Sequence, residues 1–166
     1  MKSKAAIGDH PIHPMIVPIP IGAFFLAVAG DLTHAATSDP FWYRFSYVCI
    51  GAGLAFALLA AVFGIIEYFG VKMSTPGRRL AAWHARLNVA VILLYAVSFW
   101  VRRDGGALGT DRWPLALWTS LLAFVLLGLS GWLGGNLSYH HKVGVVESKD
   151  PEALEIGMRE AKGGAR

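Results

Sequence analysis

Residues 47–71 read YVCIGAGLAFALLAAVFGIIEYFGV, and Glu67 is the single charged residue among them. A helix needs about 20 predominantly apolar residues to cross the hydrocarbon core of a bilayer, and this stretch exceeds that length. In water such a helix would expose an apolar surface with almost no polar group to solvate it. The stretch is therefore predicted to be a transmembrane helix, and it sets the fold class of the chain.

Three further stretches of the same kind accompany it. They are Met15–Thr33, in which Asp31 is the one charge, Ala81–Val101, in which Leu87–Val101 is uncharged, and the uncharged Pro114–Tyr139. Apolar residues make up 55% of the 166 positions and charged residues 16%, which is far from a soluble average. We predict an all-α integral membrane protein, built as a four-helix up-down bundle.

The chain is expected to divide into a membrane domain and a tail. Residues 1–142 form the four-helix transmembrane domain, and residues 143–166 form a cytoplasmic C-terminal tail. Asp150-Pro151-Glu152 has the features of a helix start, namely a capping residue, a proline at the first helical position and an acid in the first turn. A short tail helix from Pro151 to about Ala161 is expected. No internal repeat is evident in the sequence.

Basic residues are distributed unevenly between the two sides of the predicted bundle. Eleven lie on the side with both termini and the middle loop, and four lie in the other two loops. The first group is Lys2, Lys4, Lys72, Arg78, Arg79, Arg86, Lys142, Lys149, Arg159, Lys162 and Arg166, and the second is Arg44, Arg102, Arg103 and Arg112. Positive-inside bias then predicts a multi-pass protein of the inner, cytoplasmic membrane with both termini in the cytoplasm. Anionic lipid accounts for the basic excess, and no motif for nucleic acid is present.

Cysteine usage and the first residues exclude two further classes. Cys49 is the only cysteine, so an internal disulfide, a CxxC metal site and covalent c-type haem attachment are all excluded. Lys2 and Lys4 precede an apolar run, as in a secretory signal. However, Pro18, Pro20 and the polar stretch before them fit the apolar core of a signal peptide badly, so we expect the first helix to be retained.

Titratable residues collect at one end of the predicted bundle. His13 opens the first helix, Glu67 lies near the end of the second, His84 opens the third, and His140 with His141 closes the fourth. Because alternate helices run in opposite directions, these positions share one membrane face. A titratable side chain at membrane depth is costly and by default marks a pairing, a ligand or a proton path. The clustering is the strongest functional signal in the chain.

Two asparagines lie where they could support these histidines. Asn88 follows His84 by four residues and Asn136 precedes His140 by four, so each pair shares a helix face. A ligating imidazole usually donates its other N–H to an oxygen of a neighbouring group. We therefore predict His13, His84, His140, Asn88 and Asn136 as cofactor-binding residues.

Each of these residues also has a purely structural interpretation. The histidines could be interfacial residues, and Glu67 could pair with a basic residue of the middle loop. At the opposite end, Asp31 is expected to form a salt bridge with Arg44 or Arg102. Small residues at four-residue spacing, Gly53, Ala57 and Ala61 and then Gly131 and Gly135, indicate close helix packing, or alternatively contact with a flat cofactor.

Three motifs carry a resemblance to a known family. They are HPIHPMIVPIPIG at residues 10–22, WHARLN at residues 83–88 and GWLGGNLSYHHKVGV at residues 131–145. In these motifs the chain resembles an uncharacterised bacterial membrane family of the domain-of-unknown-function type, over roughly residues 8–146. The family commonly carries an acid where this chain has Asn136. The resemblance implies a four-helix integral membrane domain, sometimes found near redox proteins, and no particular reaction.

Three functions fit the sequence. The first is a redox module with a b-type haem between two histidines of different helices, His13 and His84, with Trp83 and Trp132 lining it. The second is a non-haem divalent metal site formed by His13, His84, His140 and Glu67. The third is a partner subunit of a membrane redox complex that has no chemistry of its own. No residue is predicted to be catalytic.

Overall fold

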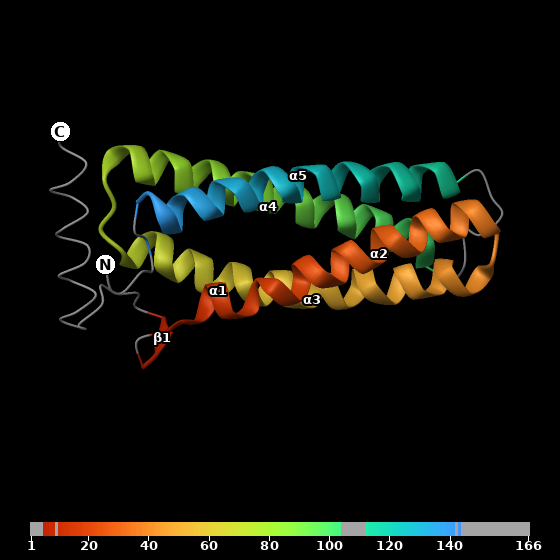
Figure 1. The fold of residues 1–166 in the computed structure, drawn as a ribbon, viewed down its shortest axis with the longest axis horizontal. Helices are drawn as coiled ribbons and strands as arrows, with labels where there is room; N and C mark the ends of the chain where they lie inside the picture. The colour runs from red at the N-terminus through yellow and green to blue at the C-terminus, as the bar shows by residue number, and fades with distance from the viewer. Residues whose placement is uncertain (1–4, 9, 104–111, 142, 144–166) are drawn as a thin grey trace, which may run out of the picture.

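The computed structural model describes residues 5–8, 10–103, 112–141 and 143, and four long helices make up most of them (Figure 1). The four are α2 (Pro18–Thr37), α3 (Pro40–Gly70), α4 (Thr75–Arg102) and α5 (Trp113–Tyr139), preceded by β1 (Ala6–Ile7), β2 (His10–Pro11) and α1 (Ile12–Ile16). Each span is long and apolar enough to cross a membrane, with α1 and α2 together forming the first. The predicted all-α membrane fold is thus confirmed, whereas the expected tail helix lies outside the described residues.

Capping residues and prolines fix where the long helices begin. The Asp39 carboxylate accepts a hydrogen bond from the Phe41 backbone N–H at 2.9 Å, with Pro40 in the first turn of α3. The Ser74 hydroxyl accepts one from the Gly77 N–H at 3.3 Å and caps α4. Thr75-Pro76-Gly77, which the sequence favours as a loop turn, is therefore the first turn of α4. A proline there is tolerated because the first helical N–H groups have no intrahelical partner.

The segment before Pro18 is more ordered than the sequence predicts. In the sequence, Pro14, Pro18 and Pro20 crowd this segment and favour a regular helix only from near Ile19 or Ile21. Instead β1 and β2 pair as a short antiparallel hairpin around Gly8, whose φ of 62° suits glycine. The five-residue helix α1 follows directly, and Val17 joins it to α2. His13 consequently lies on a short helix of its own.

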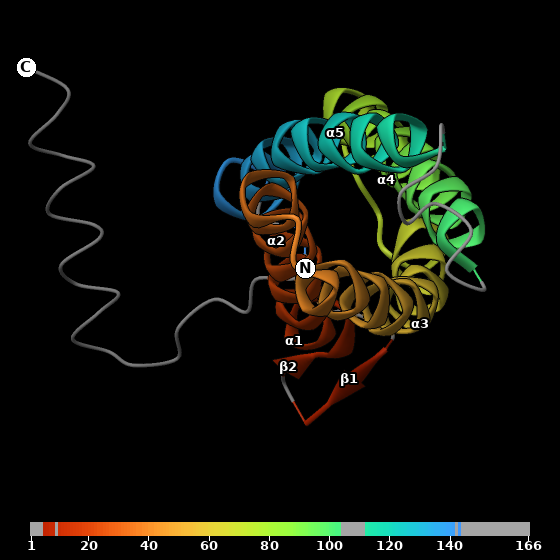
Figure 2. The same cartoon turned by 90° about the vertical axis from the view of Figure 1, so that its right-hand side faces the viewer.

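The four long helices surround a common axis (Figure 2). Helix α2 packs along α3 and α4 packs along α5, while α3 with α4 and α2 with α5 close the ring. Helices α2 and α4 therefore lie diagonally opposite each other and run in the same direction. Many large apolar side chains point outward, such as Phe69 at 76% exposure and Trp118 at 67%, as expected for helices that face lipid.

The buried positions reveal a repeat that the sequence pattern does not. The buried positions of α2 include Pro20, Phe24, Ala27 and Asp31. The residues 71 positions later are buried in α4, and they are Val91, Tyr95, Ser98 and Arg102. Buried residues of α3 and α5 correspond in the same way, at a shift of 70 positions. Those of α3 are Ser46, Ile50, Gly53, Ala60 and Glu67, and their counterparts in α5 are Ala116, Ser120, Ala123, Ser130 and Leu137. The α2–α3 and α4–α5 hairpins are thus pseudo-equivalent. The sequence hides this because most paired positions differ in chemistry.

Pseudo-equivalent residues meet along the centre of the bundle. The rings of Phe24 and Tyr95 stack with centroids 3.9 Å apart and planes 3° from parallel. A Cβ atom at Gly53 would lie 2.5 Å from the Phe24 ring, so only glycine fits at this position. The close-packing role expected for Gly53 is confirmed.

Candidate cofactor site

The first pair of pseudo-equivalent residues is His13 and His84, and their rings face each other near the end of the bundle where the chain begins. The ring centroids are 6.5 Å apart and the ring planes are perpendicular, at 89°. His13 comes from α1 and His84 from the first third of α4. Two of the predicted site residues, distant in sequence, are therefore brought together.

Both rings are anchored in the same way. The Nδ1 atom of His13 lies 2.8 Å from the carbonyl oxygen of Ala60, and the Nδ1 atom of His84 lies 2.8 Å from that of Ser130. Because a carbonyl oxygen can only accept, each Nδ1 must carry the proton and donate it. In the neutral form of such a ring Nε2 carries no proton, which is the form in which imidazole binds a metal.

Equivalent glycines make room for the two rings. One helical turn after Ala60 and Ser130 come Gly64 and Gly134, and a Cβ atom there would lie 3.1 Å from Cε1 of His13 and 3.0 Å from Cε1 of His84, respectively. A larger side chain at either glycine would push the ring away. The repeat thus supplies the same three parts twice: a histidine, a carbonyl acceptor and a glycine.

The other glycines of α5 differ from their expected packing role. Cβ atoms built at Gly131 and Gly135 would meet nothing within 4 Å. Gly131 and Gly135 therefore do not form a close helix contact within the described part of the chain. Trp83 and Trp132, expected to line the site, are 58% and 73% exposed, so their rings lie on the outer surface of the bundle.

Asn88 supports His84 as the four-residue spacing predicts. Its Nδ2 atom lies 3.1 Å from Nε2 of His84 and 2.8 Å from the hydroxyl oxygen of Ser130, to which it donates. The Ser130 hydroxyl in turn lies 3.1 Å from Nδ1 of His84. The positions that correspond to Asn88 and Ser130 in the first hairpin are Val17 and Ala60, which have no polar side chain.

The remaining predicted site residues come after Gly64 and Gly134, toward the ends of α3 and α5. His140 caps the C-terminus of α5 and is exposed, whereas His141 is partly buried near Gly77, where a Cβ atom would lie 3.4 Å from its Nδ1. Asn136 is partly buried, and its carbonyl accepts the backbone N–H groups of both histidines. Glu67 is 8% exposed on α3. Of the two terminal histidines, the one that packs against the bundle is therefore His141.

The four-ligand metal set finds no support in this geometry. Among the residues that the structure describes, no group of three or more His, Cys, Asp or Glu side chains is placed to hold a metal ion. His13 and His84 form a pair, which is too few for a structural zinc site, where four ligands are usual. Two histidines could hold a metal ion only if other groups supplied the remaining ligands.

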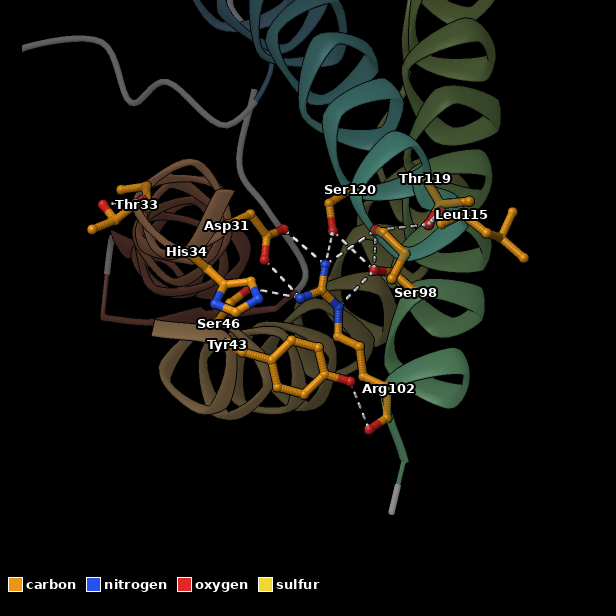
Figure 3. A network of polar contacts seen from close by, with 12 residues as sticks. Asp31, Thr33, His34, Tyr43, Ser46, Ser98, Arg102, Leu115, Thr119 and Ser120 are labelled. Atoms are coloured by element: carbon orange, nitrogen blue, oxygen red, sulfur yellow. Dashed lines mark hydrogen bonds and ion pairs between the residues drawn. The ribbon is translucent and has the colours of Figure 1, made fainter. Parts of the chain in front are cut away.

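The last pair of pseudo-equivalent residues forms a second polar centre at the opposite end (Figure 3). Asp31 and Arg102 are fully buried, and both carboxylate oxygens accept from the guanidinium, at 2.6 and 2.8 Å. The expected salt bridge is thus confirmed with Arg102 as the partner. Arg44, the other candidate, is an exposed residue of α3 rather than a loop residue.

Serine hydroxyls and a carbonyl complete the shell around Arg102. Its nitrogens donate to the hydroxyls of Ser98, Ser120 and Ser46 and to the Ala116 carbonyl, at 3.1 to 3.3 Å. The rings of Tyr43 and Trp113, which are themselves pseudo-equivalent, lie 5.6 and 5.4 Å from the guanidinium carbon. From the sequence, Arg102 was predicted to lie in a loop. The signal that could have found this centre is the spacing, because Asp31 follows His13 as Arg102 follows His84.

Comparison with known proteins agrees with this architecture. No curated protein and no solved structure matches the chain. A family model described as a predicted membrane protein, DUF2231, matches residues 9–147, which include all four long helices and both polar centres. The chain belongs to the DUF2231 family of predicted membrane proteins.

Proposed function

We propose that this protein is a membrane redox module that holds a b-type haem between His13 and His84. The separation of the two rings carries the proposal. With metal–nitrogen bonds of about 2.0 Å, one metal ion could lie between the two rings and be held by a nitrogen of each. The centroids of His13 and His84 are 6.5 Å apart.

The hydrogen bonds of the two rings suit axial ligands. Each Nδ1–H donates to a backbone carbonyl, which fixes the ring orientation and raises the basicity of Nε2. When bound, a haem with two histidine ligands would supply one-electron transfer at a potential tuned by its ligands and their surroundings. Gly64 and Gly134 keep the rings seated against α3 and α5.

One observation favours the partner-subunit alternative. The Nε2 atom of His84 already lies 3.1 Å from the Asn88 amide, so both nitrogens of this ring have partners without any cofactor. A polar cluster of this kind could simply fix how α4 packs on α5. Haem binding requires the Asn88 amide to turn away from Nε2, so the two functions predict different spectra and different effects of mutation.

The orientation belongs to the same proposal. The end of the bundle with the histidine pair also carries exposed Lys72, Arg78, Arg79 and Arg86. Positive-inside bias places this end at the cytoplasmic face of the inner membrane, which would offer the haem to cytoplasmic or membrane-bound redox partners.

The visible spectrum of the purified protein, measured with iron and zinc content, tests the function. We expect a Soret band, split α and β bands after reduction and about one iron per chain. His34→Ala is the matched control, because this histidine lies at the opposite end of the bundle, where its Nδ1 donates to the Asp39 carbonyl, and the variant should keep full occupancy. Stoichiometric metal without a Soret band would favour the non-haem site, and a protein free of both would favour the partner subunit.

A further inference from the structure

The two histidines have equivalent positions but unequal surroundings. We infer that His84 is the fixed ligand of the site and His13 the exchangeable one, whose place a small neutral molecule such as carbon monoxide can take. The inference rests on the proposed haem function, which does not specify whether either histidine can be exchanged. It follows from the difference between the groups that contact His84 and the groups at the pseudo-equivalent positions around His13.

His84 is held from several directions. It lies within the continuous helix α4, with regular helix on both sides. Its Nδ1 lies near both the carbonyl and the hydroxyl of Ser130, at 2.8 and 3.1 Å. The Asn88 amide donates to this hydroxyl at 2.8 Å and keeps it beside the ring. Displacement of this ring would break a connected set of hydrogen bonds between α4 and α5.

His13 has a weaker hold. The bond from Nδ1 to the Ala60 carbonyl is the hydrogen bond described for its ring. The first hairpin has Val17 and Ala60 at the positions of Asn88 and Ser130. His13 therefore has no counterpart of the polar side chains that surround His84. Loss of this single bond would leave the ring held by packing contacts, such as the one with Gly64.

The backbone around His13 also permits movement. Helix α1 is five residues long and none of its residues is buried. Pro18 and Pro20 follow immediately, and a proline N–H is missing from the hydrogen-bond ladder that would tie α1 firmly to α2. The bonds described across the junction run from the Val17 N–H to the His13 carbonyl and from the Ile21 N–H to the Val17 carbonyl, at 3.1 and 3.3 Å. Helix α1 can therefore move His13 outward while α2 stays in place.

The class of molecule follows from the location. The vacated position lies beside the Ala60 carbonyl and Gly64 of α3 and faces His84 of α4. The charged residue nearest to it along α3 is the buried acid Glu67. The free-energy cost of desolvation is low for a small neutral molecule that enters this position, whereas an anion would lose its hydration without gaining a partner. Carbon monoxide added to the dithionite-reduced protein is the direct probe.

The first test compares three proteins in their visible spectra and haem content. Reduced wild-type protein should form a carbon monoxide complex. His13→Ala should retain haem, lose the six-coordinate spectrum and bind carbon monoxide faster, whereas His84→Ala should lose most of its haem. Equal haem loss in the two histidine variants, or a wild-type spectrum that carbon monoxide does not change, would overturn the inference.

The correspondence between the two hairpins suggests a variant that adds the missing polar contacts to His13. The double substitution Val17→Asn with Ala60→Ser gives His13 the same neighbours that His84 has. Val17 has helical backbone angles, φ −51° and ψ −36°, so an asparagine there can reach back one turn as Asn88 does. Haem should stay bound while carbon monoxide binding falls by about tenfold or more, the size of effect that outer ligand contacts usually have. Unchanged carbon monoxide binding with the haem in place would contradict the role of the missing network.

A measurement on haem-free protein separates this inference from the haem proposal. Diethyl pyrocarbonate acylates unprotonated imidazole, and mass spectrometry locates the label. His13 should be labelled several times faster than His84, with exposed His140 as the fast reference. Absence of a Soret band would reject the haem proposal, whereas equal labelling of His13 and His84 would reject their inequality whether or not haem binds.

Discussion

Asp31 and Arg102 occupy pseudo-equivalent positions of the two hairpins, and their side chains form a fully buried two-point ion pair, with N···O distances of 2.6 and 2.8 Å. A buried charge is tolerated only when its partner and hydrogen bonds remain in place. The serines and the Ala116 carbonyl around Arg102 meet this condition. The pair therefore locks the first hairpin to the second at the end of the bundle opposite the histidines.

Breaking this pair should cost more stability than most single changes in the bundle. Asp31→Asn leaves Arg102 buried without a counter-charge, and we expect a loss of about 3–5 kcal/mol. Replacing both residues together, Asp31→Leu with Arg102→Met, should cost less because no lone charge remains. Unfolding in detergent, followed by the loss of helical signal, measures the difference.

Tyr95 offers the matched control for this prediction. Its hydroxyl is buried and has no hydrogen-bond partner among the described residues, and its pseudo-equivalent is already Phe24. Tyr95→Phe should be neutral or stabilising by about 1 kcal/mol, because an unpaired buried hydroxyl is costly. An Asp31→Asn protein as stable as Tyr95→Phe would show that the ion pair contributes little.

Gly64 and Gly134 should be needed for the seating of the histidine rings. Alanine at either position places a Cβ about 3 Å from the ring edge, and we expect both a stability loss of about 1–3 kcal/mol from overpacking and reduced haem content. Gly131→Ala is the control, since its Cβ would meet nothing within 4 Å. Haem content at matched protein levels checks the prediction, and equal values for Gly134→Ala and Gly131→Ala would contradict it.

Asn88 should affect binding strength without being essential. Asn88→Ala removes the amide that donates to the Ser130 hydroxyl, which itself lies 3.1 Å from Nδ1 of His84, and haem affinity should fall by about 10–100-fold. Thr119→Val is a suitable control, because Thr119 lies toward the opposite end of α5 and its hydroxyl donates to the Leu115 carbonyl of its own helix. Haem transfer to an acceptor protein gives the affinity. A tighter hold on haem in Asn88→Ala would mean that the amide competes for Nε2.

Apolar runs and prolines made the membrane fold predictable, because a hydrophobic stretch of spanning length has few alternatives to a transmembrane helix. The proximity of His13, His84 and Asn88 was also predictable, since residues at the same end of antiparallel helices, or four apart on one helix, lie close together in a helical bundle. His140 illustrates the limit. One residue of helix turns a side chain by about 100°, so the sequence could not tell which of His140 and His141 packs inward.

The repeat and the buried Arg102 were not predicted because they depend on tertiary pairing. Ile50 corresponds to Ser120, and Asp31 corresponds to Arg102. Positions that share a place in the fold can therefore hold opposite chemistry when their partners across the bundle complement them. Only the arrangement of α2 against α4 shows that Arg102 points inward.

The orientation of the bundle can be tested with reporters fused at Gly106 and at the C-terminus. From the uneven distribution of basic residues we expect a periplasm-dependent reporter to be active at Gly106 and inactive at the C-terminus. A cytoplasm-dependent reporter should give the reverse result. Periplasmic activity at the C-terminus would invert the proposed orientation and place the histidine pair at the outer face.

The perpendicular arrangement of the His13 and His84 rings, at 89°, should be visible in the electron paramagnetic resonance of the oxidised protein. Perpendicular axial imidazoles make the two iron orbitals that bond with them nearly equal in energy, which gives one resolved signal at an unusually large g value, whereas parallel rings give three resolved signals. The angle is set by the bonds to the Ala60 and Ser130 carbonyls, which the haem does not need to break. A three-line spectrum would show that the rings rotate when haem binds. The Gly134→Ala protein, in which the His84 ring is displaced, should shift the signal, while His34→Ala should leave it unchanged.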